Sequence, residues 1–121
     1  MRHLTILVTL LNLLLLSSCE NQVIKASEAD QHIGAYATIQ GTVASVKSLH
    51  LGKPNEIHLI NLTRPYPNQD FTVVIGGRYI RRFGPVTHYE GKEIQATGKI
   101  YRYKGKPQVK LKSANKLRII K

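Results

Sequence analysis

The sequence predicts an all-β domain of five strands, with one short helix before them and one helical insert among them. From residue 36 onward, apolar and polar residues alternate in short segments, which is the period of a half-buried strand. Glycine, proline and asparagine separate these segments, as they do in turns. The longest apolar run lies elsewhere, at residues 4–16. Together these observations predict one small β domain that begins near residue 27.

A short helix is expected at the start of this domain. Ser27 is suited to the N-cap position, and Asp30, three residues later, provides the acidic side chain of a capping pattern. Gly34 is expected to end the helix after about two turns. Residues 20–26, which precede it, are expected to form a short tether.

The first three strands are expected over residues 36–48, 56–62 and 71–75. The first of them is long and contains Gly41, and a glycine inside a strand commonly marks a bulge or a strong bend. Residues 51–55 form the loop between the first two strands. A proline-containing loop separates the second strand from the third.

The remaining elements follow a helical insert. One helical turn is expected at residues 78–83, where a Gly-Pro pair stops it. The fourth strand is expected over residues 93–103, and a tight turn at residues 104–107 leads into a fifth strand over residues 108–112. Alternation in the fourth strand places four residues on one face: Ile94, Ala96, Gly98 and Ile100. A final apolar edge consists of Leu117, Ile119 and Ile120.

Five strands with a helical insert between the third and the fourth match the order of the OB-fold. This fold is a small, partly open Greek-key barrel. A long, bent first strand allows one strand to serve both halves of such a barrel. An SH3-like barrel is the alternative, but its connections are shorter and it has no insert after the third strand.

The N-terminal segment carries a separate signal, which ends at Cys19, the single cysteine of the chain. Arg2 supplies a positive charge, and residues 4–16 form an apolar segment shorter than the ~20 residues that span a bilayer. Residues 16–19, Leu-Ser-Ser-Cys, resemble the lipobox of bacterial lipoproteins. The resemblance implies cleavage before Cys19 and acylation of its sulfur and its new amino terminus. Two or more acyl chains anchor a protein stably.

This interpretation divides the chain into a signal peptide at residues 1–18, a lipidated cysteine and tether at residues 19–26, and an OB-fold domain at residues 27–121. Glu20 follows the cysteine, which in the lipoprotein family resembles outer-membrane sorting. The expected location is the bacterial cell envelope, with the domain anchored in the outer membrane and facing the periplasm. The alternative is an ordinary cleaved signal, or a tail anchor, in which Cys19 has no role.

The charge of the chain is strongly positive and unevenly placed. The formal net charge is +11. Residues 20–76 carry four Lys or Arg and five Asp or Glu, whereas residues 77–121 carry 13 Lys or Arg and only two Glu. Such a field attracts polyanions, so candidate partners are nucleic acid, lipopolysaccharide, phospholipid headgroups and acidic wall polymers. A generally basic exported protein is the alternative.

Three stretches of the domain carry a family likeness. They are residues 29–34 with 38–43, residues 59–62 with 66–69 and 71–75, and residues 89–94 with 97–100 and 103–109. The last stretch contains the run Thr-Gly-Lys-Ile, followed by a basic turn and a short returning strand. These stretches resemble a group of small bacterial OB-fold domains related to tRNA-anticodon-binding and single-strand-binding modules. The resemblance implies binding of single-stranded nucleic acid or another oligomeric ligand.

The candidate binding site consists of basic segments that carry tyrosine. OB-folds that bind single strands combine a cationic groove with aromatic faces on which bases stack. The chain has no Trp and two Phe, so tyrosine must supply most of the stacking. The residues expected at the site are Tyr101, Tyr103, Arg102, Lys104, Lys106, Arg78, Tyr79, Arg81, Arg82, Tyr66 and His58. Alternatively, the tyrosines only cover the hairpin or cap the barrel, and Arg81 and Arg82 form a solvated side of a helical turn.

The sequence shows no catalytic or metal-binding pattern. The mature-chain histidines have no ligand spacing on one element, and no nucleophile has a neighbouring base. The catalytic Asp, Glu and Arg set of staphylococcal-type nucleases, which share the barrel, is absent. We therefore expect a non-catalytic protein without metal or cofactor that binds a polyanion, foremost single-stranded nucleic acid. The alternative is an envelope-interaction lipoprotein whose basic face contacts anionic lipid, lipopolysaccharide or an acidic protein partner.

Overall fold

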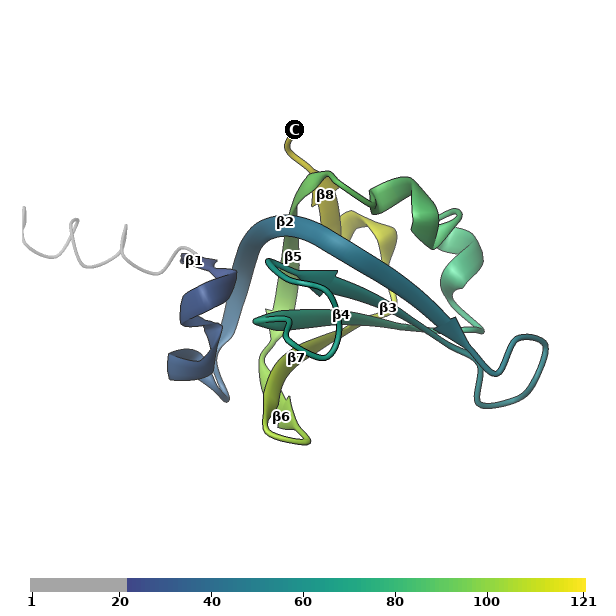
Figure 1. Cartoon of the computed structure of the whole chain (residues 1–121), viewed down its shortest axis with the longest axis horizontal. Helices are drawn as coiled ribbons and strands as arrows, with labels where there is room; N and C mark the ends of the chain where they lie inside the picture. Colours follow the sequence, from purple (N-terminus) through teal and green to yellow (C-terminus); the bar gives the residue numbers. More distant parts are fainter. Residues whose placement is uncertain (1–21) are drawn as a thin grey trace, which may run out of the picture.

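The computed structural model describes residues 22–121 and shows a strongly bent β-sheet with short 3₁₀ helices around it (Figure 1). The strands are β1 (Val23–Lys25), β2 (Tyr36–Leu49), β3 (Ile57–Leu62), β4 (Phe71–Gly76), β5 (Glu93–Lys99), β6 (Tyr101–Tyr103), β7 (Lys106–Leu111) and β8 (Leu117–Ile119). The 3₁₀ helices are η1 (Ala26–His32), η2 (Ile80–Arg82), η3 (Val86–Tyr89) and η4 (Ala114–Lys116). The expected all-β class is confirmed. The expected signal peptide and Cys19 lie outside the described residues.

The expectation of five strands is wrong, because the described part of the chain has eight. β1 pairs in parallel with β2, and β8 pairs with the outer edge of β5. The expected fourth strand is divided into β5 and β6, because the residue between them bonds elsewhere. The N–H of Ile100 donates to the carbonyl of Ala35 at 2.9 Å, and its carbonyl accepts from the N–H of Gly34 at 2.7 Å. Neither bond belongs to a strand ladder.

β2 serves both halves of the sheet, as the sequence predicted. Its first half, residues 36–42, pairs with β5, and its second half, residues 43–49, pairs with β3. The register shifts between Val43 and Ser45, so the bulge lies just after Gly41. Gly41 itself is required by packing, because an added Cβ would lie 3.0 Å from Ala26 Cβ and 3.3 Å from Leu62 Cδ1. The resulting arch of β2 is visible in Figure 1.

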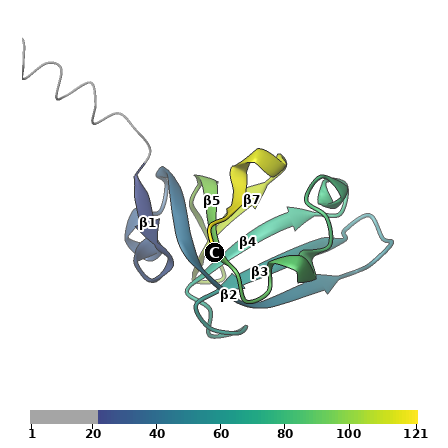
Figure 2. The ribbon, with the colours of Figure 1, turned by 90° about the horizontal axis from the view of Figure 1, so that it is seen from above.

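The ladder of paired strands is open, so the barrel is not closed. Its order is β6-β7-β4-β3-β2-β5-β8, with β1 added beside β2, and among the described strands no pairing joins β5 to β7. These two strands lie side by side and pack through side chains (Figure 2). An added Cβ at Gly98 of β5 would lie only 2.6 Å from Val109 Cγ2 of β7. An open ladder of this kind remains consistent with the partly open barrel of an OB-fold.

The N-terminal segment is fastened to the sheet from Gln22 onward. The N–H of Thr38 donates to the carbonyl of Gln22 at 3.0 Å, and β1 continues the contact. The helix that follows starts two residues earlier than expected, since Lys25, not Ser27, is its N-cap, without a side-chain cap. The start is set by burial, because Ala26 in the first turn is buried against the sheet.

The insert between β4 and β5 contains two helical turns where one was expected. η2 lies within the expected segment, and η3 follows in what was expected to be a loop. Tyr89 joins them, because its buried hydroxyl donates to the carbonyl of Phe83 at 2.8 Å. Val86 and Phe83 are also buried, so the insert closes one end of the core.

The core is apolar and takes alternate residues from each strand. Phe71, Val73 and Ile75 face inward from β4, and the row expected from the fourth strand is buried: Ile94, Ala96, Gly98 and Ile100. Thr72 and Val74 face the other way, yet they too are buried. Among residues 22–121, no helix has the length and apolar character needed to cross a membrane.

Replacing Gly98 by alanine should destabilise the domain by about 1–3 kcal/mol, because the new methyl group would overlap with Val109 Cγ2. Chemical denaturation measures the loss. Gly76→Ala is the control, since its methyl would approach Tyr79 only to 3.6 Å. A midpoint equal to that of the control would contradict close packing of β5 on β7.

Candidate functional site

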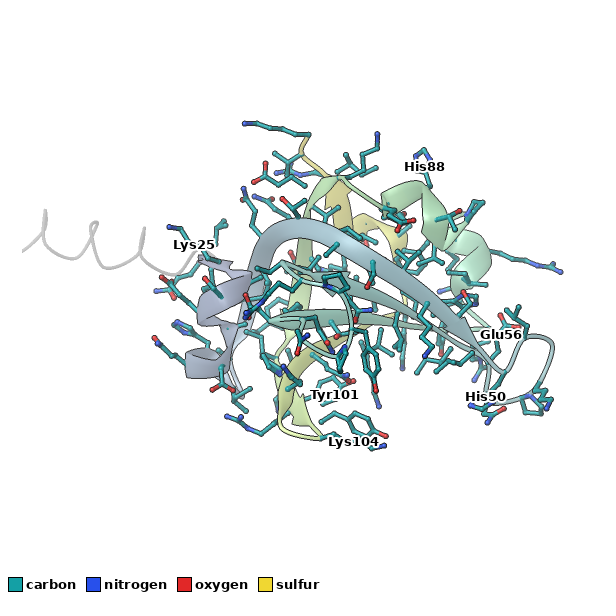
Figure 3. All side chains as sticks on the ribbon, viewed as in Figure 1. Lys25, His50, Glu56, His88, Tyr101 and Lys104 are labelled. Atoms are coloured by element: carbon teal, nitrogen blue, oxygen red, sulfur yellow. The ribbon has the colours of Figure 1, made fainter. Side chains whose placement is uncertain are left out.

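A groove of ≈ 650 Å³ crosses the outer face of β2, β3 and β4. The loop between β3 and β4 and the β6–β7 hairpin form its walls. Figure 3 shows Tyr101 and Lys104 on the side of the sheet opposite His88, with His50 near the tip of the β2–β3 hairpin. The lining residues are Lys47, Leu49, His50, Asn55, Ile57, Leu59, Asn61, Tyr66, Pro67, Gln69, Thr72, Val74, Tyr101, Tyr103, Lys104, Lys106, Gln108 and Lys110.

Strand alternation places these side chains outward. In β3, Ile57, Leu59 and Asn61 line the groove, whereas Ile60 and Leu62 are in the core. The same alternation directs Lys47 and Leu49, near the end of β2, toward the groove. It also directs the even-numbered residues of β4 and β7 toward it. The apolar floor is thus the second face of a sheet whose first face is the core.

The groove is cationic. Four lysines line it, Lys47, Lys104, Lys106 and Lys110, and no carboxylate does. Several acidic side chains of the described residues are paired elsewhere: Asp30 with Arg102, Glu56 with His58, and Asp70 with Arg64. The lysines therefore have no acidic partner within the groove.

Each of the three groove tyrosines has a lysine over its ring. The Nζ atom of Lys47 lies 5.2 Å from the ring centroid of Tyr66, and that of Lys104 lies 5.5 Å from the centroid of Tyr103. The two residues are 56% and 53% exposed, so a ligand can reach their side chains.

Tyr101 is the more buried tyrosine of the groove. The Nζ of Lys110 lies 5.3 Å from its ring centroid, and its hydroxyl donates to Gln108 Oε1 at 2.9 Å. Burial, and after it the nearby hydroxyl of Tyr103, raises the pKa of Tyr101 to about 12. The side chain is therefore neutral at physiological pH and adds no negative charge to the groove.

A buried polar network lies under one end of the groove. Asn61 Nδ2 donates to Ser45 Oγ at 3.2 Å, Thr72 Oγ1 donates to Asn61 Oδ1 at 3.0 Å, and Gln69 Nε2 donates to Thr72 Oγ1 at 3.2 Å. Gln69 Oε1 is buried without a hydrogen-bond partner. Lys106 Nζ donates to the carbonyl of Gln69 at 3.1 Å and so ties the hairpin to the loop.

The groove brings together five of the residues that the sequence placed at the site: Tyr66, Tyr101, Tyr103, Lys104 and Lys106. Arg102, which lies between two of them in β6, projects to the opposite side and forms an ion pair with Asp30 at 2.7 Å. Lys47 and Lys110 also line the groove, although they were not among the residues expected at the site. Lys110 could have been found, because it alternates with inward Val109 in the expected fifth strand.

His58 faces away from the groove. It is buried, with Nδ1 2.7 Å from Ser48 Oγ and Nε2 2.8 Å from Glu56 Oε2. Glu56 Oε1 also accepts from the N–H of Gly52 at 2.8 Å. These bonds hold the loop between β2 and β3, so the position of His58 supports a structural role.

The remaining expected residues gather beyond the end of β4, around Tyr79. Arg78 and Arg82 place their guanidinium carbons 5.4 Å and 5.2 Å from its ring centroid, and Lys112 places its Nζ at 5.9 Å. Arg82 Nη1 also donates to the carbonyl of Lys112 at 3.0 Å. Arg81 is exposed on the same turn. None of these residues lines the groove.

Within residues 22–121, no group of three or more His, Cys, Asp or Glu side chains is placed to hold a metal ion.

Solved structures with a similar fold include the two that are described below. No protein-family model matches the chain, and no curated protein sequence matches it. One similar structure is provisionally described as a nucleic acid-binding lipoprotein from Klebsiella pneumoniae; it has a TM-score of 0.50 and 8% identity and covers 87% of this chain and 96% of its own. Another is provisionally described as an aspartyl-tRNA synthetase from Leishmania major, with a TM-score of 0.53, 11% identity and 84% of this chain covered, but only 21% of the synthetase. At these identities the likeness concerns the fold alone.

Replacing Glu56 by glutamine should reduce stability at neutral pH and flatten the acid side of the stability profile. The hydrogen bond from Gly52, and then that from His58, lowers the pKa of Glu56 below 4.5. A carboxyl with a lowered folded-state pKa contributes stability above its unfolded pKa and loses it as pH falls through the folded value. Thermal unfolding between about pH 7 and pH 3 should therefore show the two proteins converging in acid.

Glu90→Gln, on an exposed carboxylate, is the matched control. Parallel profiles for wild type and Glu56→Gln over the whole range would show that Glu56 contributes nothing to the pH dependence.

Proposed function

We propose that the domain binds single-stranded nucleic acid in the groove, without catalysis, and that Cys19 anchors it by lipid in the bacterial envelope. The observation that carries the proposal is the composition of the groove. Three tyrosines and four lysines line it, no carboxylate does, and its floor is apolar. Single-strand binders combine these same features, namely a cationic track for the phosphates and flat faces for the bases.

The tyrosine–lysine pairs suit an exchange of partners on binding. A cation over an exposed aromatic ring contributes about 0.5–1 kcal/mol. A stacked base contributes about 1–3 kcal/mol. A base can therefore displace Lys47 from Tyr66 or Lys104 from Tyr103, and each released ammonium group then pairs with a neighbouring phosphate. The lysine is not lost to the complex, because it moves from the ring to the backbone of the ligand.

Single strands suit this groove better than duplexes. Stacking on Tyr66, Tyr101 and Tyr103 needs unpaired bases, and in a duplex the bases are already stacked and paired.

The second candidate is docking of the basic surface on an envelope polyanion. The observation in its favour is the excess of cations over residues 77–121, which extends beyond the groove to exposed Lys92, Lys116 and Arg118. The lipobox-like run supports a lipid anchor, and Glu20 after Cys19 supports a location in the outer membrane, facing the periplasm. Nucleic acid would be met there during uptake, conjugation or in a surface matrix.

The mature chain should bind a labelled single-stranded oligonucleotide more tightly than the matching duplex and than heparin. Fluorescence anisotropy across a salt series measures this, and the logarithm of the affinity should fall with log salt by ~0.7 per neutralised phosphate. Equal binding of all three ligands that disappears near physiological salt would favour the envelope polyanion.

Replacing Tyr103 by alanine should weaken binding of the single strand by roughly 5–160-fold, the loss of one stacked base at about 1–3 kcal/mol. Tyr36→Ala is a matched control, because Tyr36 is also 53% exposed and has Lys116 Nζ at 5.8 Å from its ring, yet it lies outside the groove. Equal losses in the two variants would contradict stacking in the groove.

A further inference from the structure

We infer that the bound strand continues past the groove onto a second platform around Tyr79, so that the domain has two anion- and base-binding subsites in series. This inference rests on the proposed function. The second subsite, here called the Tyr79 cluster, consists of Tyr79, Arg78, Arg81, Arg82 and Lys112.

The Tyr79 cluster repeats the chemistry of the groove. Tyr79 is half-buried and surrounded by Arg78, Arg82 and Lys112 at 5.2–5.9 Å from its ring centroid. Arginine and lysine side chains that face a phosphate can bind it, and a ring held by packing on the core is a rigid partner for a base. No ion pair with a carboxylate involves these cations in the described part of the chain.

The two subsites are joined along β4 and β7. The two strands are parallel neighbours, with Val74 beside Lys110 in the register. Val74 and Lys110 line the groove, and the next outward residue of β4 is Gly76. The position of an added Cβ at Gly76 lies 3.6 Å from the Tyr79 ring, so the cluster begins where the groove ends.

β7 connects the groove with the Tyr79 cluster a second time, independently of the contact through Gly76. Lys110 lies over Tyr101 in the groove, and Lys112, two residues later, lies over Tyr79 in the cluster. Two successive tyrosine–lysine pairs therefore follow one another along β7 and the residue after it. Gly76 leaves the passage between them free of a side chain, which a passing strand of nucleic acid requires.

The arrangement predicts that binding depends on the length of the strand. A short oligonucleotide fills the groove alone, and a longer one also reaches the Tyr79 cluster. OB-folds occupy about 4–16 nucleotides, so single strands that cover this range separate the two cases. Anisotropy titrations with oligothymidylates of increasing length, at two or more salt concentrations, provide the measurement.

The test variant is Arg78→Gln/Arg81→Gln/Lys112→Gln, which removes three exposed cations of the cluster and leaves Tyr79 in place. It should bind the shortest strands as wild type does, and lose the gain in affinity that wild type shows with the longest ones. Its salt slope on the longest strands should fall by about 2, which is three phosphates at ~0.7 each. The control is Lys92→Gln/Lys116→Gln/Arg118→Gln, which has the same net charge and lies outside both subsites.

Equal losses on short and long strands in the test variant would overturn the inference, and so would equal losses in the test and control variants. Either result would mean that the cluster contributes only diffuse charge. A failure of the proposed function looks different: wild type would then show no preference for single strands, and Tyr103→Ala would have no effect even on the shortest ones. Circular dichroism confirms that both triple variants are folded.

Discussion

The architecture depends on β2 changing its pairing partner within a single strand. Residues 36–42 bond to β5 and residues 43–49 bond to β3, so one continuous backbone joins the two parts of the sheet. The bend requires Gly41, because helix η1 approaches the strand there through Ala26. It also gives the sheet two usable faces: the concave one encloses the core, and the other carries the groove. The insert η2–η3 then closes the end of the core that β2 leaves open.

Alternation in the sequence was enough to locate most of the main strands and their inward rows, because these strands alternate between a buried and a more exposed face. β4 is the exception, since every residue from Phe71 to Ile75 is buried. The shorter elements could not be predicted in this way. β1 and β8 have three residues each and are defined by their partners in the sheet. The interruption at Ile100 is a tertiary effect as well, since Gly34 and Ala35 are distant in sequence and take both of its backbone hydrogen bonds. The prediction of Ser27 as the N-cap was wrong, because burial of Ala26 moved the start of the helix toward the N-terminus.

The sequence predicted which types of residue form the candidate site, but it predicted only some of the individual residues. The tyrosines of β6 and the lysines of the following turn could be expected to share a surface, since they belong to one hairpin. Arg102 belongs to the same hairpin but to its other face, where Asp30 pairs with it. Lys47 is far from the hairpin in sequence and joins the groove only because β2 crosses the sheet beside β3. The polar network around Asn61 had no local signal, because its members come from three different segments.

The early attachment of the chain to the sheet has a geometric consequence for the proposed lipid anchor. The backbone is bonded to β2 from Gln22 onward, through Thr38 and then through β1. Only three peptide steps separate Cys19 from Gln22, and a chain of that length reaches at most about 10 Å. With so short a connection, the lipid-anchored domain would stay at the membrane surface and could not reach far into the periplasm. It would bind ligands that arrive at the membrane, and the orientation of its groove relative to the bilayer would be restricted by where the chain joins the sheet.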